Sequence, residues 1–69
     1  MVTTFAYSVG EAVLILKLPS VFHGLTGKVI ELDNAVDWYK VEFQGVGAFN
    51  ERVDGETCWF KRGELVLAL

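Results

Sequence analysis

The clearest strand signal in the chain is the stretch Asp37-Trp38-Tyr39-Lys40-Val41-Glu42-Phe43. Every second residue from position 39 to position 43 is apolar and large, and the residues between them are Trp38, Lys40 and Glu42. Because successive side chains of a strand point to opposite faces, this alternation buries one face and leaves the other more polar. The stretch therefore predicts a half-buried strand from Asp37 to Phe43.

On either side of this stretch, turn residues divide the chain into four more short runs, which is typical of an all-β domain. The expected strands are Ala12 to Lys17, Thr26 to Leu32, Glu56 to Phe60 and Glu64 to Leu69. The expected connections are Ser8 to Glu11, Leu18 to Leu25, Asp33-Asn34, the long loop Gln44 to Gly55, and Lys61-Arg62-Gly63. The last of these is short enough to be a single 3₁₀ turn.

No segment has a sustained helical period, because glycines interrupt each candidate. Five short strands, one long loop and a tight turn instead describe an all-β fold. We expect a small five-stranded SH3-like barrel with a short 3₁₀ turn before the last strand. The 69 residues suffice for a single domain over residues 1–69. Within it, residues 1–9 are expected to form an arm or an extra strand, and Met1 to Tyr7 fits either description.

The segments Leu14 to Lys17 and Val21 to Val29 together resemble the KOW motif, which consists of a strand, a loop and a G-x-x-G turn into a second strand. That motif occurs in ribosomal proteins and transcription elongation factors. Gly24 and Gly27 would supply backbone freedom where the chain turns sharply. The resemblance implies a module that binds nucleic acid or a ribonucleoprotein.

The layout from Gly10 to Leu69 is also similar to that of small photosynthetic accessory barrels, namely the stromal barrel subunit of photosystem I and the variable chain of ferredoxin–thioredoxin reductase. The matching positions are Gly10 and Val13, Gly27 and Val29, Val41 and Phe43, and Phe60, Glu64 and Leu65. These are core and turn positions, so they concern the fold, and a fold does not imply a function. The resemblance implies a small accessory subunit.

The composition favours a protein partner. Hydrophobic residues make up 52% of the chain, and a domain this small has little interior in which to bury them. No disulfide can stabilise it, because Cys58 is its only cysteine, and with His23 as its only histidine it lacks the ligands for a structural zinc. Exposed apolar residues that gather in a patch mark an interaction site. We expect a protein partner or a homo-oligomer, and no cofactor.

The charge and the ends of the chain limit the other classes of partner. The net charge is −3, with nine acidic and six basic residues, which disfavours nonspecific binding to nucleic acid or to an anionic membrane. No apolar run is long enough for a transmembrane helix, and the N-terminus does not have the pattern of a signal peptide. A cytoplasmic protein with a reduced thiol is the expectation.

Catalysis is the least supported function. Cys58 has no histidine near it in sequence to activate it, and next to Trp59 it fits a small packed residue. Asp33 and Asp37 flank one turn, where capping explains them better than paired acid–base chemistry. The remaining route to an enzyme is a homo-oligomer whose subunits share a pore. We expect no catalytic residue and no metal ligand within one chain.

The candidate protein-binding residues are Leu14, Leu16 and Trp38. Leu14 and Leu16 should face away from Val13 and Ile15, and Trp38 lies opposite its inward-facing neighbour Tyr39. These three side chains would then form an apolar strip across two strands. The alternative is that both faces are covered, either by the strong bend of the barrel or by the arm Met1 to Tyr7. The expected function is a non-catalytic protein-interaction module, or a small accessory subunit, that binds a partner or itself.

Nucleic-acid binding is the alternative function. Lys17, His23 and Lys28 surround the KOW-like loop, and Trp38 and Trp59 could stack on bases. Solvated lysines on the rim of a barrel explain the same cations without any ligand, and the negative balance of the chain favours that explanation.

Overall fold

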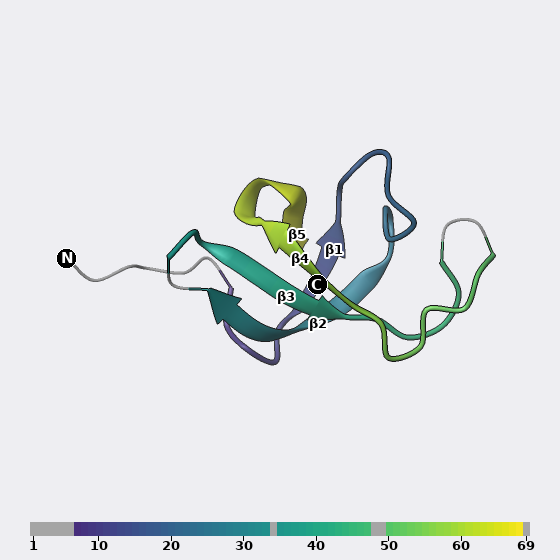
Figure 1. Cartoon of the computed structure of the whole chain (residues 1–69), viewed down its shortest axis with the longest axis horizontal. Helices are drawn as coiled ribbons and strands as arrows, with labels where there is room; N and C mark the ends of the chain where they lie inside the picture. The colour runs from purple at the N-terminus through teal and green to yellow at the C-terminus, as the bar shows by residue number, and fades with distance from the viewer. Residues whose placement is uncertain (1–6, 34, 48–49, 69) are drawn as a thin grey trace.

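The computed structural model describes residues 7–33, 35–47 and 50–68, and these form one antiparallel sheet of five strands (Figure 1). The strands are β1 (Ala12–Ile15), β2 (Thr26–Asp33), β3 (Trp38–Glu42), β4 (Thr57–Lys61) and β5 (Leu65–Leu67), with the 3₁₀ turn η1 (Arg62–Glu64) before β5. They lie in the order β4-β3-β2-β1-β5. The predicted all-β fold, with five strands and a 3₁₀ turn before the last one, is confirmed.

Most element boundaries differ from the prediction by one or two residues, and two of these differences have a clear cause in the structure. β1 ends at Ile15 and not at Lys17, because the backbone of Leu16 leaves the pairing with β2 and donates a hydrogen bond to the Glu64 carbonyl at 2.8 Å. The 3₁₀ turn begins one residue later than expected, because Lys61 is still paired with Trp38 in the sheet. The Glu64 carboxylate then accepts a hydrogen bond from the Lys61 backbone N–H at 2.9 Å and closes the turn.

β2 is the strand that bends the sheet around the core. Thr26 to Lys28 pair with β1 and Lys28 to Asp33 pair with β3, so Lys28 is paired on both sides. The register with β3 shifts between Val29 and Glu31, as at a β-bulge. A bulge kinks a strand and increases its twist. The connected strands therefore curve into a small globule, and Figure 1 shows β2 sweeping beneath the other strands.

The two glycines of the KOW-like segment serve different purposes. Gly24 has φ +82°, so it supplies the left-handed backbone that the turn requires, as predicted. Gly27 lies inside β2, with no positive φ, and the prediction of a sharp turn there is wrong. A Cβ at Gly27 would overlap the Val41 side chain and approach the Glu42 carbonyl oxygen at 2.9 Å, so this glycine permits close packing of two strands.

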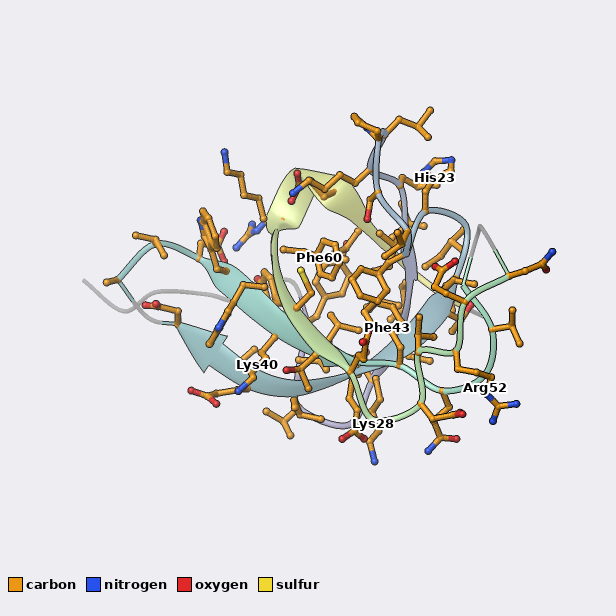
Figure 2. The ribbon with its side chains drawn as sticks, turned by 45° about the vertical axis from the view of Figure 1, so that its right-hand side comes forward. His23, Lys28, Lys40, Phe43, Arg52 and Phe60 are labelled. Carbon is orange, nitrogen blue, oxygen red and sulfur yellow. The ribbon has the colours of Figure 1, made fainter. Side chains whose placement is uncertain are left out.

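Among the described residues, nine buried apolar ones form the core: Val13, Ile15, Val29, Tyr39, Val41, Phe43, Val53, Phe60 and Leu65. The rings of Phe22 and Phe43 stack with their centroids 4.2 Å apart, and Phe43 meets Phe60 edge-on at 6.0 Å. Figure 2 shows Phe43 and Phe60 pointing into the space between the strands, whereas Lys28 and Lys40 point outward. The inward-facing residues predicted from the alternation at 39, 41 and 43 are all buried.

The long loop expected after β3 contains backbone pairing of its own. Val46 and Arg52 form an isolated antiparallel bridge, and the Val53 N–H donates to the Gly45 carbonyl at 2.9 Å. Val53 is fully buried and so belongs to the core. The described parts of this segment project away from the sheet at the right of Figure 1.

The expected arm Met1 to Tyr7 lies outside the described residues except for Tyr7. Its ring meets the Tyr39 ring edge-on at 5.2 Å, and its hydroxyl donates a hydrogen bond to the Leu65 carbonyl at 2.9 Å. Tyr7, Ser8 and Val9 are not part of a strand. Tyr7 therefore packs against the core and the edge of β5. No helix of the described residues has the length and hydropathy required to cross a membrane.

Candidate functional site

The outer faces of β1 and β5 form one apolar surface, which we call the apolar strip. Leu14 is paired with Val66, and the Ala68 N–H donates to the Ala12 carbonyl at 3.0 Å, so these residues lie side by side. By the alternation of side chains, the outward set is Ala12, Leu14, Leu16, Val66 and Ala68. None of these residues carries a charge.

The strip is exposed and its backbone is held in place. Leu16 is 47% exposed and Val66 is 39% exposed, whereas Leu14 between them is half-buried. The hydrogen bond from the Leu16 N–H to the Glu64 carbonyl fixes the end of β1 against η1. Leu16 therefore presents an apolar side chain to solvent from a fixed position, and the described part of the chain leaves it exposed.

Trp38 does not belong to this strip. Leu14 is paired with Thr26, the first residue of β2, whereas Trp38 is paired with Asp33, the last residue of β2. β2 thus lies between the two strands, and the residues sit at opposite ends of it. The predicted strip of Leu14, Leu16 and Trp38 is not continuous, because alternation along single strands does not reveal which strand ends become neighbours.

Trp38 belongs instead to a second surface, the Trp–Lys ladder, on the outer face of β3 and β4. The register pairs Trp38 with Lys61 and Lys40 with Trp59, so the two indoles lie on one diagonal and the two ammonium groups on the other. The Lys61 Nζ lies 5.7 Å from the Trp38 ring centroid, and the Lys40 Nζ lies 5.9 Å from that of Trp59. Lys40 also pairs with Glu31 at 3.8 Å. Sequence reasoning missed Lys40 and Lys61, although the alternation already placed Lys40 beside Trp38.

The remaining candidate nucleic-acid residues are divided between two places. The Lys17 backbone N–H donates to His23 Nδ1 at 3.0 Å, so these two residues lie together, with Nδ1 as the acceptor. The Lys17 ammonium pairs with Glu64 at 3.4 Å and lies 5.8 Å from the Phe60 ring centroid. Lys28 lies on the outer face of β2, opposite Ala12 and Glu42. The five predicted residues therefore do not form one patch.

A shallow hollow of about 360 Å³ adjoins the apolar strip at Ala12. It is lined by Ala12, Thr26, Gly27, Lys28, Glu42 and Gln44. Ala12 belongs to the strip, and Thr26 is paired with Leu14 at its centre. The hollow is therefore continuous with the strip, and Lys28, which points outward in Figure 2, stands at its side.

Asp33 and Asp37 have structural partners in the turn between β2 and β3, and Cys58 is packed within the sheet. Asp33 accepts a hydrogen bond from the Ala35 N–H at 2.9 Å, and Asp37 has φ +56°, so both serve the turn as predicted. The Tyr39 hydroxyl at 2.7 Å, and then the Arg62 guanidinium at 2.7 Å, hold the pKa of Asp37 below its usual value. Cys58 is half-buried opposite Val41. Within the described parts of the chain, no three His, Cys, Asp or Glu residues gather as metal ligands.

These features define a class of protein. The chain is a small five-stranded antiparallel all-β protein, with a bent sheet consistent with a small barrel and two distinct outer surfaces. No protein-family model, curated protein or solved structure matches the chain.

Proposed function

We propose that the chain is a non-catalytic protein-interaction module, or a small accessory subunit, built on an SH3-like barrel. The strand order β4-β3-β2-β1-β5, the bulge in β2 and the 3₁₀ turn before β5 support this architecture. The observation that carries the function is the apolar strip, in which five neighbouring outward residues bear no charge. A contiguous apolar surface of this kind is typical of a protein-binding site.

The exposure of the strip gives an energetic reason for a partner to bind there. Full burial of a Leu or Val side chain contributes about 1.5–3 kcal/mol, and Leu16 and Val66 each leave a large fraction of that burial unrealised in the single chain. A partner surface that covered both side chains would gain this free energy of burial. The strip lies on the ordered strands β1 and β5, so little conformational entropy is lost when a partner binds.

Leu16→Asp tests this function. We expect the variant to fold, because Leu16 is exposed, and to lose the protein that wild type retains in affinity capture from the native cell. Val36→Asp is the matched control, since Val36 is 55% exposed in the turn between β2 and β3, away from the strip. Capture that is unaffected by Leu16→Asp would show that the strip is not the binding site.

Binding of nucleic acid, in the manner of a KOW module, is the second candidate. The Trp–Lys ladder supports it, because it combines two aromatic rings with two cations at the β4 edge of the sheet. Lys17, His23 and Lys28 lie elsewhere, and Glu31 and Asp33 flank the ladder on β2. We therefore expect weak binding to single strands.

Fluorescence titration with a single-stranded oligonucleotide over a series of salt concentrations tests this candidate. The affinity should decrease with salt, because it depends on ionic contacts between lysines and phosphates. Trp59→Ala should weaken the binding, because it removes a ring on which a base can stack. Leu16→Asp should leave it unchanged, because Leu16 lies outside the ladder. Binding that Trp59→Ala leaves intact would remove the ladder as the nucleic-acid site.

A further inference from the structure

We propose that the partner of the apolar strip is a second copy of this chain. A two-fold axis near Leu14 would relate the copies, and Leu16 of each would occupy the hollow beside Ala12 of the other. The inference rests on the proposed protein-binding function of the strip and adds the identity of the occupant. It follows from the distribution of charge, the arrangement of side-chain sizes and the place of the hollow.

Charge favours self-association at this face. Each chain has a net charge of −3, so two copies repel one another as a whole. The outer faces of β2, β3 and β4 carry charged residues, among them Lys28, Glu31, Lys40 and Lys61, whereas the strip carries none. Two identical chains therefore meet with the least like-charge contact at the strip. A strongly charged partner would find no complementary group within it.

The sizes of the side chains make the strip self-complementary. Along β1 the outward residues are Ala12, Leu14 and Leu16, and Ala68 lies beside Ala12 on β5, so one end of the strip is small and the other is large. Ala12 and Leu16 are each two residues from Leu14, which is about 7 Å in a strand. A two-fold rotation about Leu14 therefore places the large end of one copy over the small end of the other, as an isologous interface requires.

The hollow supplies the space for the large end. It opens beside Ala12 and is lined by Thr26, by Gly27 without a side chain, and by Lys28, Glu42 and Gln44. The hollow is open to the outer surface, and its lining residues other than Gly27 are not buried, so Leu16 of a second copy can approach it without displacing a core residue. Each copy offers one Leu16 and one hollow, so the dimer has two identical contacts and no vacant one.

Five residues and a hollow are fewer than the roughly 20–30 residues on each side of a standard interface. The dimer should therefore be reversible and dependent on concentration. Sedimentation equilibrium of the full chain should give a mass that increases from one chain to two as its concentration increases. An unchanged single-chain mass across the series would overturn the proposal. The strip would still be an interaction site if Leu16→Asp lost its captured partner.

Two variants test the contact itself. Leu16→Ser removes the side chain that enters the hollow, and Ala12→Phe fills the hollow from its edge; both positions are exposed, so both variants should fold. Each should raise the dissociation constant at least about tenfold. Val36→Ser, which removes a similar side chain from the β2–β3 turn, should leave it unchanged. A dimer that survives both variants would contradict the proposed contact.

Mixing the two variants provides the sharpest test. Leu16→Ser retains an open hollow, and Ala12→Phe retains Leu16, so a mixed pair can form one of the two contacts. The mixture should contain more dimer than either variant alone at the same total concentration. A mixture that stays as monomeric as its components would contradict the exchange of Leu16 between hollows, even if wild type dimerises by another surface.

Discussion

At the scale of the residue, Gly27 shows how one missing side chain permits the bend of the sheet. It occupies an inward position of β2, where its neighbours on β3 are Val41 and the Glu42 carbonyl. Its backbone has no positive φ, so the requirement for glycine is a requirement for space. The same residue lines the hollow beside the apolar strip, and it therefore influences both the core and the outer surface.

Gly27→Ala should lower the free energy of unfolding by about 1–3 kcal/mol, because an added methyl in a packed core forces its neighbours to move. Chemical denaturation monitored by tryptophan fluorescence measures this change. Gly63→Ala is the control, since a Cβ there meets no atom within 4 Å and Gly63 has no positive φ. Equal stabilities of Gly27→Ala and wild type would mean that β2 and β3 are not in close contact at this point.

At the scale of the element, η1 connects the core strands to the apolar strip. Glu64 holds this short turn through three bonds: its carboxylate accepts from the Lys61 N–H, the same group pairs with the Lys17 ammonium, and its carbonyl accepts from the Leu16 N–H. The hydrogen bond from the Lys61 N–H, and then the hydrogen bond and the charge of Lys17, lower the pKa of Glu64. The turn therefore sets the position of β5 and of Leu16.

This arrangement predicts an acid-dependent loss of stability. Because the pKa of Glu64 is lower in the folded chain, its contribution is complete above the ordinary value of 4.5. The contribution disappears as the pH falls from there through the lowered folded pKa. The free energy of unfolding, measured between pH 7 and pH ~2, should fall less steeply below 4.5 in Glu64→Gln than in wild type.

At the scale of the whole molecule, the outer surface is divided in two. The face of β1 and β5 is apolar and uncharged, and the face of β3 and β4 alternates Trp with Lys. The separation arises because β2 lies between the two pairs of strands. A single small domain can therefore present one surface to a protein and a chemically different one to solvent or to a second ligand.

If two chains associate through the apolar strip, stability must depend on concentration, because association stabilises the folded chain by mass action. The midpoint of thermal unfolding of wild type should increase over a roughly hundredfold range of protein concentration. The midpoint of Leu16→Ser should stay constant over that range. Calorimetry at several concentrations measures both, and a constant midpoint for wild type would argue against the dimer.

Much of the fold could be predicted because its signals are local. The alternation at Tyr39, Val41 and Phe43 reveals the strand and its buried face, since a period of two follows from backbone geometry alone. The turn residues Asp33 and Gly24 act through their own backbones in the same way. These features need no knowledge of distant residues.

The candidate site could be predicted only in part. The alternation of side chains places Leu14 and Leu16 on an outer face, but it gives no sign that β2 separates them from Trp38. The burial of Val53, the close approach at Gly27 and the neighbourhood of Val66 and Leu14 also depend on pairings between distant residues. Local sequence determines which way a side chain points, whereas strand order and register, set by packing of the whole chain, determine what lies beside it.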